Sequence, residues 1–439
     1  MRLWRAGLIL GVLLFTMGAA PLELASPIKV SWDHRFFEDA QGKPFLLQGD
    51  TAWSLIAELK REDTEIYLKD RSKRGFNAIL VNLIEHQFSS NPPANAYGDK
   101  PFLKEAFGEL NPRYFDHAAW VIEQAQKQGL VVFLAPAYLG VNGGNQGWFE
   151  QAEAAGPEKM RTYGEAVAHR FSKFSNIVWV LGGDFDPPDR ELVIELSHGI
   201  TSVSPSAIQT VHTGSNVSAG EIWSDQPWLG IDTVYTYDDV NEAVLQRTKL
   251  MKMPVILLES SYEYERDTTA QTIRRNAYGA LLGGAAGQFF GNHPIWHFTG
   301  PGLFAIERSW QEALSSPGSQ SMTILKDLFD KIAVQQLQPD RDNNISGVER
   351  SYAAALPDRS LILIYGDVGS FKLKPDVIAS GQTVIWLDPA SGMFSTASKP
   401  DVAQDLITYQ PPDKRDDVMA TDWLLLIGSD DQLRTIQKK

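Results

Sequence analysis

The sequence contains no cysteine, which excludes disulfides, thiolate metal sites, a cysteine nucleophile and a lipid-modified amino-terminal cysteine. Basic residues are also scarce: 40 Lys and Arg stand against 54 Asp and Glu, so the formal net charge is −14. A chain this acidic, without a basic stripe, offers no electrostatic footprint for a phosphate backbone, and we expect no nucleic acid partner. No apolar run reaches the ~20 residues that a spanning helix needs, so we expect no integral membrane association.

Two well-known catalytic patterns are missing as well. No His-Glu-x-x-His or comparable ligand spacing occurs, so we predict neither a metal nor another cofactor. No Gly-x-Ser-x-Gly elbow occurs, which disfavours a serine hydrolase. Nothing in the sequence indicates an oligomeric state.

The amino terminus has the pattern of a secretory signal peptide. Arg2 and Arg5 precede an apolar run from Gly7 to Met17, and the small residues 18–20 follow it. We therefore predict a signal peptide over residues 1–25 and export to the periplasm or the medium. An uncleaved anchor is the alternative.

The rest of the 439-residue chain suits a large barrel domain with a smaller companion. From Leu46 onward, short apolar runs alternate with helical stretches, which is typical of βα units and a parallel sheet. Eight parallel strands predict an α/β fold of the (β/α)₈, or TIM, barrel type, which we assign to residues 26–338. The eight runs are Leu46–Gly49, Asn77–Leu83, Leu130–Pro136, Ile177–Gly183, Ile208–His212, Thr233–Tyr237, Val255–Leu258 and Gly287–Gly291.

Helix boundaries and loop lengths support this interpretation. Asn111 followed by Pro112 is typical of a capped helix start, and Gly129 stands where that helix should end. The stretches 85–110 and 138–157 are long loops that follow the second and third strands. Long loops at the carboxyl ends of barrel strands build active sites.

The composition changes near residues 338–344, where the chain becomes polar and typical of a loop. Beyond this point the runs Ser360–Tyr365, Thr383–Leu387 and Trp423–Ile427 alternate with Gly, Pro and Asp turns. We predict a small all-β sandwich over residues 339–439.

Two carboxylates end strongly apolar strands. Asp184 follows the fourth predicted strand and Glu259 follows the seventh, and these strand ends face each other across the mouth of a barrel. Glycoside hydrolysis needs two such groups, one protonated to donate to the leaving oxygen and one ionised to attack or to activate water. We predict that this pair is catalytic. The alternative is that each acid caps the next helix or pairs with an arginine.

Other polar and aromatic residues near strand ends are candidates for binding a carbohydrate. Asp50 and Trp53 follow the first strand, where Trp53 could stack on a sugar ring, and the alternative for Asp50 is a helix N-cap. A structural hydrogen bond is the alternative for each histidine. The further candidates are Asn82, His86, His212, Tyr237 and His293.

A series of short motifs resembles the apiosidase-like glycoside hydrolases of family 140, in the same order and with the same spacing. The resemblance covers nearly all of residues 28–330. The motifs are Gly49-Asp50-Thr51-Ala52-Trp53, Tyr67-Leu68-Lys69-Asp70-Arg71, Gly75-Phe76-Asn77, Tyr97-Gly98-Asp99, Leu110-Asn111-Pro112-Arg113-Tyr114-Phe115-Asp116, Leu181-Gly182-Gly183-Asp184, Asp225-Gln226-Pro227-Trp228-Leu229, Leu258-Glu259-Ser260-Ser261-Tyr262-Glu263 and Gly291-Asn292-His293-Pro294-Ile295-Trp296.

This resemblance implies a retaining barrel enzyme with Asp184 as acid/base and Glu259 as nucleophile, their carboxyl groups about 5 to 5.5 Å apart. Tyr97 and Trp296 stand in its motifs and join the predicted substrate-binding residues. Apiose is the sugar that the family suggests. The chain has Gly183 where most of the clan has asparagine, and Phe185 where a basic residue is expected, so the 2-hydroxyl contact is left unassigned.

The tail resembles a β-domain named for collagen binding, through Trp386-Leu387-Asp388-Pro389, Ser391-Gly392 and Asp422-Trp423-Leu424. A small sandwich beside a barrel is more often a structural brace. We therefore predict an exported, retaining glycosidase that acts on a plant or bacterial polysaccharide or oligosaccharide. The alternative is a carbohydrate- or matrix-binding protein on a barrel without catalytic activity.

Overall fold

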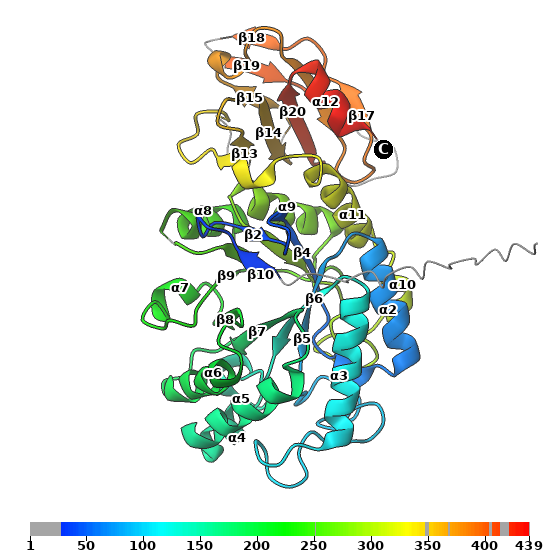
Figure 1. The fold of residues 1–439 in the computed structure, drawn as a ribbon. Coiled ribbons are helices and arrows are strands. Elements are labelled where there is room, and N and C mark those ends of the chain that lie inside the picture. The colour runs from blue at the N-terminus through cyan, green and yellow to red at the C-terminus, as the bar shows by residue number, and fades with distance from the viewer. Residues whose placement is uncertain are drawn as a thin grey trace, which may run out of the picture.

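The computed structural model describes residues 28–250, 252–346, 351–367, 369–403, 406–412 and 421–438. The predicted signal peptide, residues 1–25, lies outside the described residues. Figure 1 shows a helix-covered barrel with a β-domain stacked on the side where α9 and α11 lie. No helix in the described part of the chain is long and apolar enough to span a bilayer.

All eight predicted barrel strands are confirmed, within one or two residues at their ends. They form one parallel sheet in the order β8-β7-β6-β5-β4-β11-β10-β9. At the seam between β8 and β9, Gly230 N–H donates to Gln209 O over 2.9 Å and Thr210 Oγ1 donates to Ile231 O over 2.8 Å. The strands are β4 (Leu47–Thr51), β5 (Ala78–Asn82), β6 (Val131–Ala135), β7 (Ile177–Gly182), β8 (Gln209–His212), β9 (Asp232–Tyr235), β10 (Val255–Glu259) and β11 (Gly287–Phe290).

Helices surround this sheet, and their ends follow the capping signals of the sequence. The Asn111 side chain accepts from Arg113 N over 3.1 Å at the start of α3, and Gly129, with φ of 75°, ends that helix as predicted. The barrel helices are α1 (Leu55–Glu58), α2 (Arg61–Lys73), α3 (Pro112–Lys127), α4 (Phe149–Ala155), α5 (Pro157–Phe171), α6 (Glu191–Val203), α7 (Ala219–Ile222), α8 (Val240–Leu250), α9 (Ala270–Leu282), α10 (Trp310–Ala313) and α11 (Pro317–Phe329), with the 3₁₀ turns η1 (Val141–Gly143) and η2 (Val334–Gln336).

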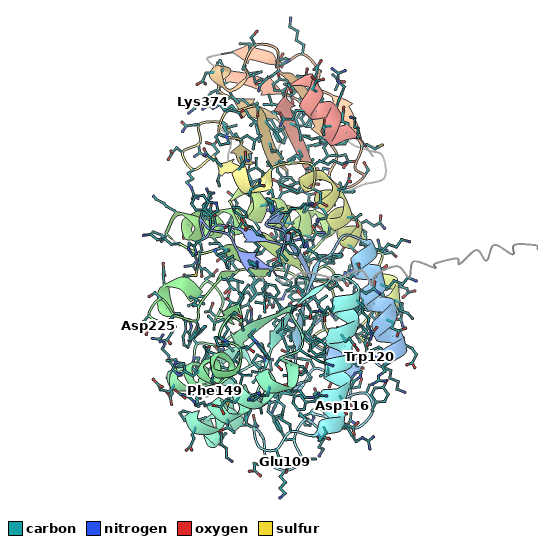
Figure 2. The ribbon with its side chains drawn as sticks, in the orientation of Figure 1. Glu109, Asp116, Trp120, Phe149, Asp225 and Lys374 are labelled. Carbon is teal, nitrogen blue, oxygen red and sulfur yellow. The ribbon has the colours of Figure 1, made fainter. Side chains whose placement is uncertain are left out.

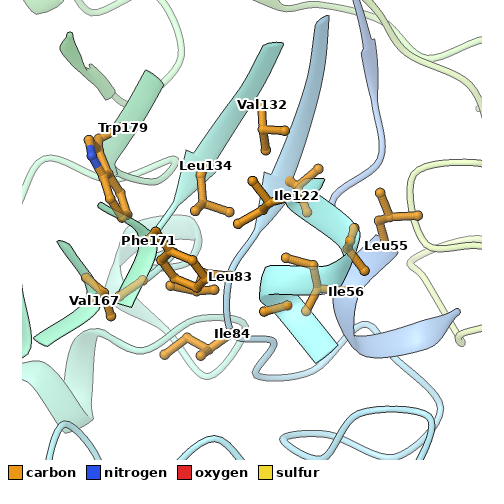
Figure 3. Close-up of a cluster of buried hydrophobic side chains, with 14 of the residues drawn as sticks. Leu55, Ile56, Leu83, Ile84, Ile122, Val132, Leu134, Val167, Phe171 and Trp179 are labelled. Carbon is orange, nitrogen blue, oxygen red and sulfur yellow. The ribbon is translucent and has the colours of Figure 1, made fainter. Parts of the chain in front are cut away.

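The barrel strands divide their side chains between two apolar layers. Val132 and Leu134 of β6 face outward and pack with Ile122 of α3 and Phe171 of α5 (Figure 3). Phe133, between them, faces the barrel interior. Because neighbouring residues of a strand point to opposite faces, this alternation decides which strand-end residue can reach the active site.

Two smaller groups of strands complete the fold. β1 (Lys29–Val30), β2 (Phe37–Glu38) and β3 (Pro44–Phe45) form a short sheet, and its Phe37 joins the core of the barrel interior. The carboxy-terminal domain contains the sheets β12-β13-β14-β20-β16-β17 and β15-β19-β18. Its elements are β12 (Gln338–Pro339), β13 (Ser351–Ala355), β14 (Leu361–Gly366), β15 (Phe371–Leu373), η3 (Pro375–Val377), β16 (Thr383–Leu387), β17 (Phe394–Thr396), β18 (Asp401–Ala403), β19 (Leu406–Tyr409), β20 (Trp423–Gly428) and α12 (Asp430–Gln437).

The barrel and the β-domain share one apolar core. A cluster of buried side chains runs from α9 and α11 into β14 and β20. Inside it, Arg274 of α9 donates two hydrogen bonds to Asp422, each 2.7 Å long, and Tyr365 donates a third over 2.8 Å. Tyr278 and Tyr365 stack with their ring centroids 4.7 Å apart. The β-domain is therefore packed onto the barrel as a brace.

The outer surface carries many of the charged side chains. Figure 2 shows Glu109 and Asp225 at the periphery of the barrel domain, and Asp225 is exposed even while it accepts from Arg190 over 2.7 Å. Exposed pairs of this kind contribute little stability. The acids that bear on function lie inside the barrel mouth.

Candidate active site

A cavity of about 540 Å³ opens at the carboxyl ends of the barrel strands. It contains both predicted catalytic acids, together with aromatic side chains that can stack on a sugar. Its lining comes from strand ends, from the two long loops after β5 and β6 that were predicted to build the site, and from the loops after β9, β10 and β11. The lining residues are Trp53, Asn82, Phe88, Tyr138, Val141, Gln146, Asp184, Tyr235, Tyr237, Glu259, Tyr262, Glu265, Trp296 and Leu303.

A glycine turn after β7 places Asp184 in this cavity. Gly183 has φ of 131°, and a Cβ atom there would lie 2.5 Å from the Tyr138 ring and 2.8 Å from Leu139 N. Asp184 itself has φ of 53°, in the left-handed region. The glycine is required because the loop after β6 passes directly over it, which explains why no asparagine stands at this position.

A β-bulge places Glu259. Ile256 and Leu258 of β10 belong to the interior core, so strict alternation would turn Glu259 outward. The pairing register with β9 shifts between Leu257 and Glu259, so that Glu259 pairs with Tyr235. Tyr235 lines the cavity, and the bulge brings Glu259 to the same side.

His212 contacts both Asp184 and Glu259. It is 1% exposed, and its Nδ1 accepts the backbone N–H of Asp184 over 2.7 Å. The proton of the neutral ring is therefore on Nε2, which lies 2.8 Å from Glu259 Oε2. His212 thus contacts the backbone of Asp184 and the carboxylate of Glu259. It is not among the cavity-lining residues, so the predicted contact between His212 and a sugar is replaced by contacts to the two acids.

The surroundings of Asp184 favour its protonated form. Burial raises the pKa of Asp184 to about 6 against the opposing effect of His212, and the nearby Glu259 carboxylate adds to the rise. Hydrogen bonds from Tyr235 and Tyr138 hold the pKa of Asp184 down in part. An acid that keeps its proton near pH 6 can donate it to a leaving group.

Four of the predicted substrate-binding residues line the cavity: Trp53, Asn82, Tyr237 and Trp296. The Trp53 indole donates to Tyr262 Oη over 3.0 Å and lies against His212, with the ring centroids 5.7 Å apart. The structure therefore brings these four side chains together with the two acids.

Asp50 does not reach the cavity, which corrects the predicted sugar contact. Leu47 and Gly49 face the barrel interior, so alternation turns Asp50 outward toward α2. There the Tyr67 hydroxyl donates to Asp50 over 2.8 Å and Arg71 Nη1 lies 3.5 Å from it. Its side chain is fully buried, so Asp50 serves barrel packing.

Three further predicted residues also lie outside the cavity lining. His86 contacts Asn145 O through Nδ1 over 2.8 Å. Tyr97 accepts from Arg61 N over 3.0 Å. His293 is buried and contacts Ala305 O through Nε2 over 3.0 Å. In each case the side chain forms a hydrogen bond to a backbone atom of the protein.

Several cavity residues were not among the predicted substrate-binding residues. Tyr138 and Gln146 come from the loop after β6, Tyr235 ends β9, and Tyr262 and Glu265 come from the loop after β10. Two of them carry a sequence signal: Tyr235 is a polar residue at a strand end, and Tyr262 stands in one of the motifs that resemble the family. Within the described ranges, no group of three or more His, Asp or Glu side chains is arranged to hold a metal ion.

Two acids at opposing strand ends of a (β/α)₈ barrel, inside an aromatic cavity, define the class of glycoside hydrolases. The Apiosidase-like catalytic domain family matches residues 31–336 of the chain. The chain belongs to this family and is a glycoside hydrolase.

Solved structures share the fold. A protein described as "Glycoside hydrolase" is 22% identical with a TM-score of 0.77, and the match covers 92% of this chain and 97% of that one. A family 5 glycoside hydrolase from Bacteroides vulgatus ATCC 8482 is 21% identical with a TM-score of 0.78, covering 92% and 94%. A family 5 mannosidase from Rhizomucor miehei is 13% identical with a TM-score of 0.53, covering 71% and 99%. No curated protein sequence matches the chain.

Proposed function

We propose that the protein is an exported, retaining glycosidase in which Asp184 is the acid/base and Glu259 is the nucleophile. Asp184 donates its proton to the leaving oxygen while Glu259 attacks the anomeric carbon and forms a glycosyl-enzyme intermediate. Asp184, now ionised, then removes a proton from the water that releases the sugar. The observation that carries this proposal is the cavity that both acids line, with His212 beneath it in contact with the backbone of Asp184 and the carboxylate of Glu259.

The unequal surroundings of the two acids support the division of roles. Asp184 lies under Tyr138 and Tyr235 and has a raised pKa, as a proton donor requires. Glu259 lies 2.8 Å from His212 Nε2, and a donor in that position fixes the orientation of the carboxyl group that is proposed to attack.

The proposed substrate is a glycoside of plant or bacterial origin, cleaved at a chain end or in a short oligosaccharide. Apiose is the sugar that family membership suggests. The sequence pattern of residues 1–25 supports export, which places the enzyme where such carbohydrates occur.

The proposal is tested by screening pectic, hemicellulosic and bacterial-surface glycosides for released sugar. We expect the wild type to release a monosaccharide, and Asp184→Ala and Glu259→Ala to lose most of this activity while remaining folded. Proton NMR of the first product should show retained anomeric configuration. Binding without release by the wild type would contradict the enzymatic function, and an inverted product would contradict the mechanism.

A further inference from the structure

The cavity contains a third carboxyl group, Glu265, for which a two-carboxylate mechanism has no role. Glu265 lies in the loop between β10 and α9 and lines the same cavity as Asp184 and Glu259. Its side chain is 16% exposed and that of Glu259 is 13% exposed. A ligand that reaches the proposed nucleophile is therefore able to reach Glu265.

Glu265 is held by one hydrogen bond and forms no ion pair with a lysine or arginine in the described part of the chain. The Trp296 indole N–H donates to Glu265 Oε1 over 2.7 Å, whereas no described residue donates a hydrogen bond to Oε2. The basic side-chain atom found near it is His293 Nδ1, at 3.9 Å, and burial lowers the pKa of His293. The carboxyl group thus has a fixed orientation and one oxygen without a donor.

Burying a carboxyl group without a close cation is unfavourable. Burial raises the pKa of Glu265 to about 7, although the hydrogen bond from Trp296 opposes this rise. A group kept in such surroundings within a cavity is a candidate for ligand recognition. Hydroxyl groups of a sugar could supply the missing donors, and among the lining residues no Lys or Arg is present to bind an acidic sugar.

We propose that Glu265 binds a sugar hydroxyl group on the Trp296 side of the cavity and selects neutral sugars that carry a hydroxyl at that position. Oε2 donates to the hydroxyl oxygen while Glu265 is protonated and accepts the hydroxyl hydrogen once Glu265 is ionised, and the hydrogen bond from Trp296 to Oε1 fixes the direction of this contact. Glu265 is therefore a specificity-determining residue of the proposed glycosidase, and this role rests on the proposed function.

The test measures binding separately from turnover, in the full chain. The parent is Glu259→Gln, and isothermal titration calorimetry gives its Kd for 4-nitrophenyl glycosides of apiose, arabinose, galactose and mannose. Glu265→Ala in this parent should raise the Kd of the preferred glycoside about tenfold or more. Glu265→Gln, which keeps an acceptor for Trp296, should give a smaller increase. Glu307→Gln, at an acid that is 82% exposed, is the matched control and should leave the Kd unchanged.

Analogues of the preferred glycoside that each lack one hydroxyl identify the contact. The parent should bind one of them more weakly, and Glu265→Ala should bind that analogue and the complete sugar equally well. A Kd unaffected by Glu265→Ala, in a protein whose wild type cleaves the glycoside, would overturn this inference and leave the proposed function intact. Glu265-dependent binding without cleavage by the wild type would contradict the proposed function alone. No binding of any of the four would contradict both.

Discussion

Two buried regions of the molecule hold carboxyl groups in opposite ways. At the contact between barrel and β-domain, Asp422 receives two hydrogen bonds from Arg274 and one from Tyr365. In the cavity, Asp184 and Glu265 stand among aromatic rings, and no Lys or Arg is among the lining residues. Burial alone is therefore a poor marker of a functional acid, and in these two regions the presence or absence of an arginine partner separates the structural acid from the acids of the cavity.

The pKa values in the cavity express the same difference. Burial raises the pKa of Asp184 to about 6 and that of Glu265 to about 7. Neither group forms an ion pair with an arginine in the described part of the chain, although the nearby charge of Arg266 lowers the pKa of Glu265 in part. The two cavity acids therefore keep their protons to a higher pH than an exposed acid does. Asp422, in contrast, binds Arg274 and so connects the β-domain to the barrel.

The strongest challenge to this comparison is the removal of the proposed nucleophile. Glu259→Gln should lower kcat by about four orders of magnitude or more, because no glycosyl-enzyme can form. The melting temperature should stay close to that of the wild type. Steady-state kinetics and thermal unfolding check both expectations. A variant that kept a tenth of the activity would remove Glu259 from the mechanism.

Removal of Asp422, the acid that pairs with Arg274, should lower stability and leave activity unchanged. Asp422→Ala leaves Arg274 buried without its partner and should lower the free energy of unfolding by about 3 to 5 kcal/mol. Activity per folded molecule should remain unchanged. Chemical denaturation measures the loss, and the double variant Arg274→Met with Asp422→Leu, which removes both charges, should recover much of it. An equal loss in the double variant would argue against the ion pair as the cause.

The pH dependence of kcat/KM sharpens the contrast further. Because Asp184 must carry its proton to donate it, kcat/KM should fall as the pH rises through about 6, by about tenfold per pH unit beyond it. For a 2,4-dinitrophenyl glycoside, whose leaving group needs little protonation, kcat/KM of Asp184→Ala should no longer fall as the pH rises through this range. A flat profile of the wild type between pH 5 and 8 would show that another group supplies the proton.

The smallest expected effect concerns stability. A carboxyl group whose folded pKa is raised stabilises the fold in its protonated form, and this contribution is lost as the pH rises through the folded pKa. Asp184→Asn removes the charge that is unfavourable above pH 6, so it should raise the melting temperature at pH 8 by about 2 °C. At pH 4 the gain should disappear. Differential scanning calorimetry at the two pH values decides this, and a gain that is equal at both would refute it.

The sequence predicts the barrel well because its strands are continuous apolar runs with clear turn signals. It also places Asp184 and Glu259, since both follow such strands. Asp50 follows a strand in the same way, yet it faces α2. Alternation along β4 explains this position, but the same rule would also turn Glu259 outward, and only the bulge in β10 reverses it. A bulge has no distinct signal in a single sequence.

The loop residues of the cavity are harder to predict. Tyr138, Tyr262 and Glu265 stand in irregular segments, where no periodicity tells which side chain faces inward. In the β-domain, the runs that became β14, β16 and β20 are confirmed as strands. The strands β15, β17 and β18 have three residues each, too few for an alternating pattern to stand out.

Covalent trapping tests the central claim most directly. The wild type is incubated with the 2-deoxy-2-fluoro glycoside of the sugar that it releases, and the labelled peptide is identified by mass spectrometry. We predict a single added glycosyl group on the peptide that contains Glu259, and none in Glu259→Gln. A label on another residue, or full turnover with an inverted product and no label, would contradict the account.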